Sequence, residues 1–386
     1  MINPPKTKFH DQHDPRRSAR KAPRREQTST QVPSFGVGAW AWGDRLFWGY
    51  ESWDAGKGGK GGMGFDACIK GGVKLFDTAE IYGPGRSEEL LGQFLRESGA
   101  KDVQVATKFA AFPWKLDRSE VWGRSASEPV LVLVLLEWVV KACKGSLERL
   151  GMDSIDIYQI HFPSVWKNEV FWDGLGDCYE QGLVKAVGVS NYGSSAVRAI
   201  SKTLGERGIP LTSNQIQYSL LYRYPELNGM KATCDELGVK ILAYSPLALG
   251  ALTGKWSDQA PSGPRGAIAE KLMKDDQWQG LLDAMKDVAG QHGPETTLSQ
   301  VAIAWCIAKG TTPIPGVRNV RQAEERPDRC GAAPKVGMRQ HWSCFVGSAP
   351  MSWLQQGVED YFVCLGSILE VANIVVEIDW IDFQSI

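Results

Sequence analysis

Four polar side chains have types and spacings suited to protonating an oxygen atom during a reduction: Asp77, Tyr82, Lys108 and His161. The phenol of a tyrosine is a weak acid at neutral pH, because its unperturbed pKa is about 10. A nearby ammonium stabilises the phenolate, so we expect Lys108 to lower the pKa of Tyr82 while Asp77 keeps the lysine charged and aimed. His161 could orient a carbonyl oxygen. Tyr82 would then protonate the alkoxide that forms as a hydride reaches the carbonyl carbon.

Each of these residues also has a simpler interpretation. Asp77 could cap the next helix or turn, and Tyr82 could be a loop aromatic. Lys108 could be a solvated strand end, and His161 a hydrogen-bonded core histidine. Their joint position at the ends of successive predicted strands favours the catalytic interpretation.

The elements that must position these side chains are alternating strands and helices. Short apolar runs predict strands at 35–40, 73–78, 103–108, 155–161, 185–190, 212–217, 239–245 and 311–315. Helical periodicity predicts helices at 87–96, 139–150, 169–181, 194–206, 225–237, 281–292 and 298–309. Near-continuous apolar strands are typical of parallel sheets buried on both faces. This alternation predicts an α/β fold, and its eight strands favour a (β/α)8 TIM barrel over an open sheet.

A barrel of this kind builds its active site from the loops that follow the carboxyl ends of its strands. The catalytic candidates close the second to fourth predicted strands. The later strands end in further polar residues, which are Ser190, Asn191, Gln215, Tyr244 and Ser245. The sequence therefore predicts that ionisable and amide side chains converge on one rim.

Several of these segments resemble motifs of the aldo-keto reductase superfamily. Val73 to Gly83 reads V-K-L-F-D-T-A-E-I-Y-G, similar to the D-T-A-x-x-Y-G signature. The T-K, Y-x-x-H and G-[VI]-S-N segments follow in order at 107–108, 158–161 and 188–191, and further matches lie at 214–218, 244–247 and 314–316. The ordered set spans about residues 35–326. The opening 38–44, G-A-W-A-W-G-D, is most similar to the plant and algal group that includes pyridoxal reductase.

The resemblance implies a role for each site residue. Tyr82 would be the proton donor, tuned by Lys108 and Asp77, and His161 would position the carbonyl. The implied cofactor is NADPH. Its predicted contacts are Ser190, Asn191 and Gln215 to the nicotinamide amide, Tyr244 on the ring, Ser245 and Leu247 along the pyrophosphate, and Gly316, Arg318, Gln322 and Glu325 at the adenosine end.

Arg318 bears on the choice between NADPH and NADH. A guanidinium binds a 2′-phosphate in bidentate fashion, which favours NADPH, although Arg318 could equally be a solvated loop arginine. The predicted activity is reduction of an aldehyde or ketone, a small-molecule substrate, to an alcohol. One alternative is a cofactor-binding regulatory subunit with little turnover, like the potassium-channel β subunits. Another is an inactive product with a disrupted C-terminus.

Composition and other motifs limit the remaining possibilities. The net charge of −1 gives no case for a nucleic acid or an anionic membrane as partner. The longest apolar run, 130–136, is too short to span a membrane. The glycine-rich 58–62 lacks the Ser or Thr of a P-loop and predicts a flexible loop into the first helix, and no Rossmann fingerprint follows a strand. The eight scattered cysteines predict reduced core residues, and no metal site is predicted.

Three segments depart from the family pattern. Residues 1–32 are basic and predict a disordered tail or a transit segment, and so a plastid or a cytoplasmic location. Within the predicted barrel, 33–326, residues 122–138 resemble an insertion that packs on the barrel, forms a lid or derives from unspliced sequence. Residues 327–386 are a divergent tail. Because Arg326-Pro327 interrupts the final helix of the pattern, the tail puts the adenosine end of the cofactor site in doubt.

Overall fold

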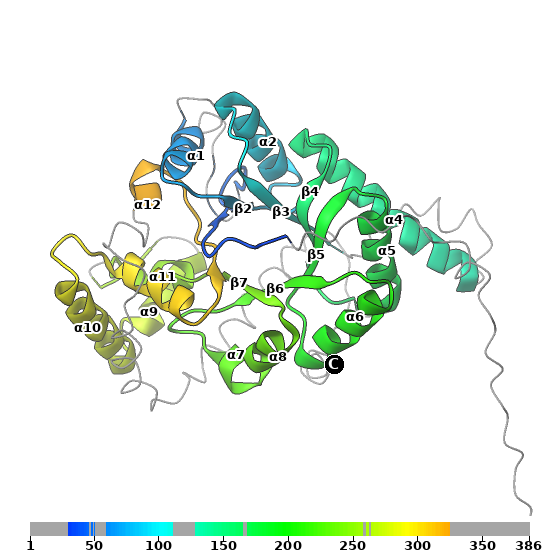
Figure 1. The fold of residues 1–386 in the computed structure, drawn as a ribbon. Coiled ribbons are helices and arrows are strands. Elements are labelled where there is room, and N and C mark those ends of the chain that lie inside the picture. Colours follow the sequence, from blue (N-terminus) through cyan, green and yellow to red (C-terminus); the bar gives the residue numbers. More distant parts are fainter. Residues whose placement is uncertain are drawn as a thin grey trace, which may run out of the picture.

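Eight parallel strands follow one another around a single sheet in chain order. Figure 1 shows the helices arranged around the outside of this sheet. The computed structural model describes residues 30–45, 48, 50, 59–110, 128–164, 168–257, 260–261 and 264–324, with the backbone alone at 60, 128–134 and 264. The strands are β1 Val37–Gly38, β2 Leu75–Asp77, β3 Gln104–Phe109, β4 Ile155–Ile160, β5 Val184–Ser190, β6 Leu211–Gln217, β7 Lys240–Tyr244 and β8 Thr312–Pro313.

Backbone hydrogen bonds close this sheet into a barrel. The amides of Gly36 and Gly38 donate to the carbonyl oxygens of Pro313 and Pro315, both at 3.0 Å. These bonds join the end of the sheet to its beginning, beside the bridge between Gly38 and Gly316. The predicted (β/α)8 barrel is thus confirmed, although several strands, β1 and β8 above all, are shorter than the apolar runs that predicted them.

The barrel interior has an apolar layer and a polar layer. The apolar layer consists of Leu75, Ala106, Ile157, Ala186, Leu242 and Ile314, and Val32 packs against it from the segment before β1. Successive strand residues point to opposite faces, so two positions further along a strand the interior changes to polar side chains such as Asp77 and Lys108. The register pairs Lys108 with Gln159 and Ser190 with Gln215. The strands therefore bring the predicted site residues to one level of the barrel.

Helices surround the sheet and bury its outer face (Figure 1). They are α1 Lys60–Lys70, α2 Arg86–Ser98, α4 Glu128–Leu150, α5 Asn168–Glu180, α6 Ser194–Glu206, α7 Tyr224–Leu227, α8 Met230–Leu237, α9 Pro264–Leu272, α10 Asp276–Gln291, α11 Leu298–Ala308 and α12 Val320–Glu324, with the 3-10 helix η3 Ala248–Thr253. Trp42, in the loop after β1, is buried among Phe65, Phe76 and Phe94. Its Nε1 donates to the carbonyl oxygen of Val317 at 2.6 Å and so ties the first loop to the last.

Some predicted elements were wrong in their boundaries. The helix predicted at 225–237 is two helices, because Gly229 adopts a left-handed conformation with φ of 78° between α7 and α8. The glycine-rich stretch at 58–62, predicted as a flexible loop, enters α1 at Lys60. Gly64 lets α1 pack closely against the backbone at Asn319, because a Cβ at position 64 would lie only 3.3 Å from the Asn319 backbone nitrogen.

Helix α4 bears on the predicted insertion at 122–138. The helix begins at Glu128, before the predicted start at Val139, and so includes the second half of that segment. Leu135 is buried and Leu136 packs against the outer core. This part of the segment packs on the barrel, whereas residues 122–127 lie outside the described part of the chain.

The cysteines that the structure describes are free thiols in buried positions: Cys68, Cys143, Cys178, Cys234 and Cys306. Burial raises the pKa of Cys234 to about 11. A thiol with such a pKa has little thiolate at neutral pH and is a poor nucleophile. These residues are therefore core residues, as predicted from their scattered spacing.

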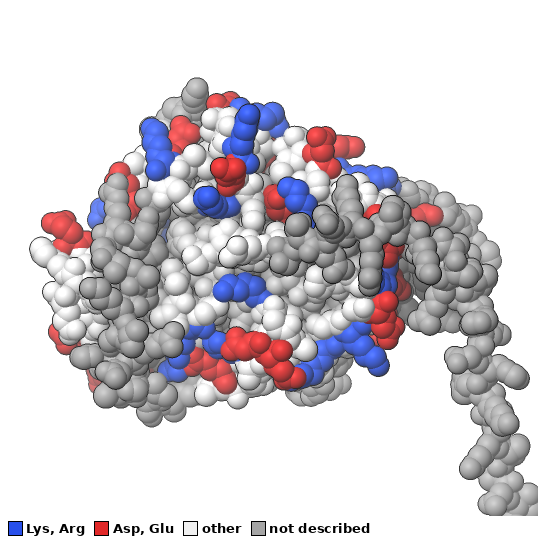
Figure 2. All heavy atoms as spheres, viewed as in Figure 1, with Lys and Arg blue, Asp and Glu red and all other residues white. Residues whose placement is uncertain are grey.

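None of the described helices combines the length and the apolarity that crossing a bilayer requires. Figure 2 shows Lys and Arg interspersed with Asp and Glu on the visible face, with uncharged residues between them. This mixture agrees with the balanced charge of the sequence.

Candidate active site

Lys108 is the centre of the buried cluster at the carboxyl end of the barrel. Its Nζ donates to Oδ1 of Asp77 at 2.6 Å and to the carbonyl oxygen of Thr78 at 2.8 Å. The Tyr82 hydroxyl accepts a longer hydrogen bond of 3.5 Å from the same Nζ. Asp77 ends β2 and Lys108 lies in β3, while Tyr82 lies in the loop between β2 and α2. The three protons of the ammonium therefore each have an acceptor.

His161, the fourth predicted catalytic residue, lies directly after β4 and joins this cluster. Its ring meets the ring of Tyr82 edge to face, with centroids 5.7 Å apart and an interplanar angle of 83°. The Asn191 side chain holds the backbone at this point, because its Nδ2 donates to the carbonyl oxygen of His161 at 3.1 Å. The structure thus brings all four predicted catalytic side chains together.

Burial dominates the electrostatics of the Asp77–Lys108 pair. Loss of water raises the pKa of Asp77, and the Lys108 charge together with hydrogen bonds from Lys108, Gln215 and Gln159 opposes that shift. Loss of water lowers the pKa of Lys108, and the Asp77 charge opposes this shift as well. Both side chains are nearly inaccessible, so each depends on the other for its charge.

The expected direction for the pKa of Tyr82 was wrong. Burial raises the pKa of this phenol well above its ordinary value, and the charges of Asp77 and Asp44 raise it further. Lys108 does not reverse the shift, since Asp77 neutralises the ammonium at 2.6 Å whereas the phenol lies 3.5 Å away. Tyr82 is therefore a fully protonated phenol at neutral pH.

A tight turn and an aromatic neighbour position the Tyr82 ring. Gly83, which follows it, has φ of 54°, and a Cβ there would lie 2.5 Å from the carbonyl oxygen of Gly43. Only glycine fits this close approach of the two loops. Trp40 stacks on Tyr82 with centroids 5.8 Å apart and an interplanar angle of 27°. The loop after β1 and the loop after β2 thus jointly fix the position of the Tyr82 ring.

The residues predicted to contact the nicotinamide form a second connected group. Tyr244 donates from its hydroxyl to Oδ1 of Asn191 at 3.0 Å, and Asn191 donates to Oγ of Ser190 at 3.0 Å. Asn191 has φ of 61°, which asparagine tolerates better than most residues. Gln215 donates from Nε2 to Oδ2 of Asp77 at 2.8 Å. The second group is therefore bonded directly to the Asp77–Lys108 ion pair.

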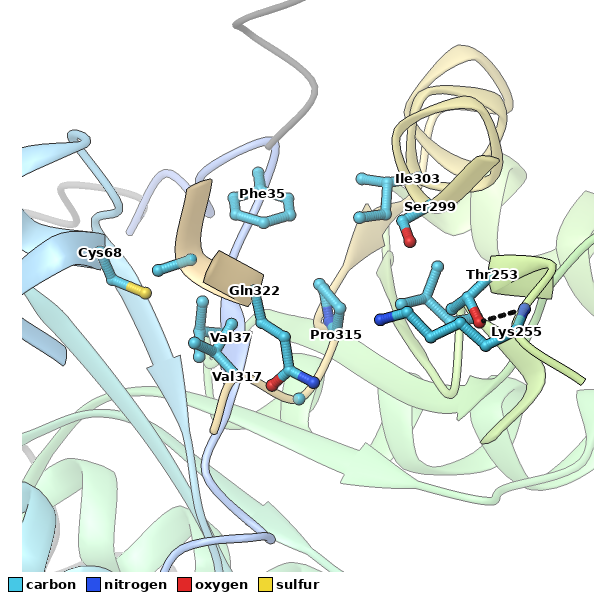
Figure 3. Close-up of a pocket in the computed structure, with 13 residues that line it drawn as sticks. Phe35, Val37, Cys68, Thr253, Lys255, Ser299, Ile303, Pro315, Val317 and Gln322 are labelled. Carbon is cyan, nitrogen blue, oxygen red and sulfur yellow. Dashed lines mark hydrogen bonds between the residues drawn. The ribbon is translucent and has the colours of Figure 1, made fainter. Parts of the chain in front are cut away.

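A small pocket lies beside the loops that follow β7 and β8. Three residues predicted for the cofactor line it, Leu247, Gly316 and Gln322. Figure 3 shows the side chain of Lys255 reaching into this pocket toward Pro315 and Gln322. Ser245 lies upstream with a left-handed φ of 49°, where the chain turns into η3.

Arg318 and Glu325, also predicted to contact the adenosine end, are not among the residues that line this pocket. The Arg318 guanidinium lies 5.4 Å from the ring centre of Trp48, and its backbone amide donates to Oε1 of Gln322 at 2.7 Å. Glu325 lies outside the described residues, as does the rest of the chain beyond α12. No group of His, Cys, Asp or Glu in the described ranges could hold a metal ion.

The sequence profile of the aldo/keto reductase family matches residues 36–330. This range covers most of the chain and includes every described residue of the site. The chain belongs to the aldo/keto reductase family. Its relatives include the chloroplastic pyridoxal reductase of Arabidopsis thaliana, which is 42% identical over 309 residues, 76% of this chain and 78% of the relative.

Two further matches to this aldo/keto reductase agree in family and fold. The Schizosaccharomyces pombe aldo-keto reductase yakc [NADP(+)] is 29% identical over 265 residues, 66% of this chain and 73% of its own. The crystal structure of the glycerol dehydrogenase of Gluconobacter oxydans superimposes with a TM-score of 0.64 at 22% identity. The superposition covers 84% of this chain and 96% of the dehydrogenase, and it supports the barrel fold.

Sequence reasoning missed several residues that this aldo/keto reductase holds at the site. Lys255 lines the pocket. Its positive charge, shortly after the Ser245–Leu247 segment predicted for the pyrophosphate, could have identified it from the sequence. The guanidinium of Arg265, at the start of α9, lies 5.1 Å from the ring centre of Trp48. No sequence motif marked this arginine as a site residue. Asp44 and Trp40 lie within the opening segment 38–44, but only the tertiary structure brings them to Tyr82.

Proposed function

We propose that this aldo/keto reductase uses NADPH to reduce the aldehyde group of a small ring aldehyde of the pyridoxal type, with Tyr82 as proton donor. One observation carries the proposal: a single buried ammonium, Lys108 Nζ, bonds both the Asp77 carboxylate and the Tyr82 hydroxyl. The site thereby couples an acid to the charge that stabilises its conjugate base. That arrangement suits protonation of an oxygen that gains negative charge.

The residues of the cofactor region fit a dinucleotide that carries phosphates. The pocket lined by Leu247, Gly316 and Gln322 also receives the Lys255 ammonium, and Arg318 supplies a guanidinium nearby. Cationic side chains of these kinds are suited to phosphate groups. Asn191, Gln215 and Tyr244 would hold the nicotinamide end. NADPH would supply the hydride, and the name of the S. pombe relative, which contains NADP(+), supports this choice.

The protein's own groups account for the movement of the proton. Tyr82 keeps its phenol proton at neutral pH, because burial and two carboxylates raise its pKa. It accepts a hydrogen bond from Lys108 and can donate its own proton to a substrate oxygen. The phenolate that forms would face the Lys108 ammonium at hydrogen-bond distance. His161, edge-on to Tyr82, would orient the carbonyl group before the transfer.

The substrate and the location are proposed from the Arabidopsis relative, which is named a chloroplastic pyridoxal reductase. A basic segment at 1–32 agrees with a plastid transit segment, although residues 1–29 lie outside the described part of the chain. We propose residues 33–326 as the catalytic barrel, with 1–32 and 327–386 as flanking segments. Import of a full-length fluorescent fusion into plastids, compared with a fusion lacking 1–32, tests the location.

The decisive experiment measures NADPH consumption by the full chain with pyridoxal and a panel of other aldehydes. Tyr82→Phe removes the acidic hydroxyl and leaves the ring, so we expect turnover to fall by about a hundredfold or more. Tyr179→Phe near the end of α5, on the side of the barrel where β5 begins, makes the same chemical change away from the cluster and should keep wild-type turnover. NADPH binding, followed by its fluorescence, should be preserved in both variants.

Each other outcome has a distinct meaning. If NADPH binds tightly but no aldehyde is consumed, the protein is a cofactor-binding regulatory subunit. If NADPH does not bind, the altered C-terminal segment has disabled the cofactor site and the chain is an inactive product. If Tyr82→Phe retains wild-type turnover, another group donates the proton.

A further inference from the structure

Ser87, in the first turn of α2, has a buried hydroxyl that bonds two segments outside its own helix. The N-cap of α2 is Gly85, so Ser87 already lies inside the helix. Its Oγ accepts a hydrogen bond of 2.8 Å from Oγ1 of Thr78 and donates one of 2.8 Å to the carbonyl oxygen of Ala39. Ser87 and Thr78 are both fully buried. The hydroxyl therefore joins the loop after β1 to the end of β2.

Thr78 carries this contact toward the Lys108 ammonium. Its carbonyl oxygen accepts a hydrogen bond of 2.8 Å from Nζ of Lys108, and its amide donates one of 2.8 Å to the carbonyl oxygen of Ala106. The Ser87 hydroxyl holds the side chain of the same threonine. Any rotation of Thr78 would move the carbonyl oxygen that Lys108 bonds. Ser87 thus helps to fix where the ammonium lies.

Ala39 carries the contact toward the Tyr82 ring. The next residue, Trp40, stacks on this ring with centroids 5.8 Å apart. The amide of Ala39 donates to the carbonyl oxygen of Asp77 at 2.7 Å, so both polar groups of the Ala39 backbone are anchored. The amide of Ser87 also donates to the carbonyl oxygen of Tyr82 at 3.2 Å. Ser87 therefore bonds the Tyr82 turn directly and supports its aromatic neighbour.

The hydrogen bond between Lys108 and Tyr82 depends most on this support. At 3.5 Å it is the longest of the three bonds from Nζ, since the other two are 2.6 Å and 2.8 Å. A hydrogen bond of this length is lost on a small further separation. Its two partners lie in different elements, β3 and the loop after β2. Ser87 is bonded to that loop and, through Thr78, to an acceptor of Lys108, so one hydroxyl links both partners.

We propose that Ser87 is a positioning residue whose hydroxyl keeps the Tyr82 phenol and the Lys108 ammonium within hydrogen-bond distance for proton transfer. The inference rests on the proposed carbonyl reduction and adds to it a residue of the outer helix α2. Ser87 acts through Thr78 and Ala39, so its effect falls on the chemical step rather than on binding. A misplacement of about 1 Å at a reacting group can cost about a hundredfold in rate.

The test compares Ser87→Ala with Ser98→Ala at the other end of α2. Ser98 is exposed, and its hydroxyl donates to the carbonyl oxygen of Leu95 in the same helix. We expect kcat for aldehyde reduction to fall by about tenfold or more in Ser87→Ala, because the buried Thr78 hydroxyl loses its acceptor. KM for the aldehyde and Kd for NADPH should stay close to their wild-type values, as for a loss confined to the transition state. Ser98→Ala should retain wild-type kcat.

A second background separates positioning from a general loss of stability. In Tyr82→Phe the phenol is gone, so adding Ser87→Ala should cause little further loss in single-turnover reduction. An equal fold loss in both backgrounds would overturn the proposal, since Ser87 would then act on the fold as a whole. If Ser87→Ala does not fold, Thr78→Val removes the same bond from its other end. Thr78→Ser keeps that hydroxyl and should lose much less kcat, and equal losses for the two would also overturn the proposal.

The fluorine NMR signal of Tyr82 provides a readout that does not need turnover. The full chain is labelled with meta-fluorotyrosine, and the signal of Tyr82 is the one missing in Tyr82→Phe. Ser87→Ala should shift this signal, and Ser98→Ala should leave it in place. An unchanged signal in Ser87→Ala would overturn the proposal. If the wild type reduces no aldehyde, the proposed reduction fails, while this signal still decides whether Ser87 positions the phenol.

Discussion

Gln215 donates a hydrogen bond of 2.8 Å from its Nε2 to Oδ2 of Asp77, across the barrel interior and 138 positions along the chain. Lys108 occupies the other carboxylate oxygen at 2.6 Å, and Gln159 lies 3.5 Å from Oδ2. The residue predicted to hold the nicotinamide amide therefore also orients the Asp77 carboxylate. We infer that cofactor binding and the state of the ion pair are linked through this one amide.

We expect Gln215→Leu to lower kcat by about tenfold, because a buried carboxylate loses a hydrogen bond that stabilises its charge. This bond opposes the upward shift in the pKa of Asp77, so without it the pKa rises further. As the pH is lowered, the variant should therefore lose activity at a higher pH than the wild type does. Steady-state pH profiles of kcat check this, with Gln104→Leu, outside the catalytic cluster, as the control. An unshifted acid limb would show that Gln215 serves the cofactor alone.

The raised pKa of Tyr82 makes a prediction for alkaline pH. The phenol must carry its proton to act as an acid, so activity is lost only as the pH rises through its pKa. That pKa lies well above 10.0, so titration of Tyr82 itself should give no alkaline limb below about pH 10 in single-turnover reduction. Stopped-flow measurements with deuterated cofactor, which identify the hydride step by its isotope effect, check this. An alkaline limb at pH 8 that disappears in Tyr82→Phe would contradict it.

Arg318→Gln tests the choice between NADPH and NADH. We expect the affinity for NADPH to fall by about tenfold or more, because a guanidinium bound to a phosphate contributes a charged hydrogen bond. NADH lacks the 2′-phosphate, and its binding should change by less than about twofold. Fluorescence titration with both cofactors measures the difference, and Arg321→Gln on the exposed side of α12 is the control. Equal losses for both cofactors would assign Arg318 a structural role.

Glu88 is a buried carboxylate whose removal should destabilise the fold. Its Oε2 pairs with Arg149 and its Oε1 accepts a hydrogen bond from Thr107, both at 2.6 Å. Glu88→Gln breaks the ion pair that joins α2 to α4, at a cost of about 2 to 3 kcal/mol in the free energy of unfolding. Urea denaturation should detect this loss. The exposed substitution Glu97→Gln should change stability by less than about 0.5 kcal/mol.

Glu226 makes stability depend on acid pH. Lys309, Tyr218 and Arg223 bond its carboxylate and lower its pKa from 4.5 to about 2. The stabilisation is complete above about pH 4.5 and is lost as the pH falls toward 2. At neutral pH Glu226→Gln should cost about 1 to 2 kcal/mol, since solvent screens part of the ion pairing. The difference between variant and wild type should shrink as unfolding is repeated below pH 4.5. A constant difference would mean that packing, not charge, is lost.

Local patterns in the sequence were enough to predict the barrel and the gathering of Asp77, Tyr82, Lys108 and His161 at one end of it. The apolar run 155–161 predicts a strand buried on both faces, and β4 is buried along its whole length. The D-T-A-E-I-Y-G segment predicts that Asp77 ends a strand five residues before Tyr82. Parallel strands share one carboxyl edge, so strand ends alone determine that these residues meet Lys108 and His161.

Only the tertiary structure decided how the site is charged. The upward direction of the shift in the pKa of Tyr82 depends on burial and on the charges of Asp77 and Asp44, none of which is encoded by spacing along the chain. Contacts between loops, such as Gly43 against Gly83 and Trp40 against Tyr82, join segments with unrelated patterns. A pKa is set by the sum of solvation and charge in three dimensions. Residue types and strand ends therefore determine which groups gather, and packing decides in which protonation state they act.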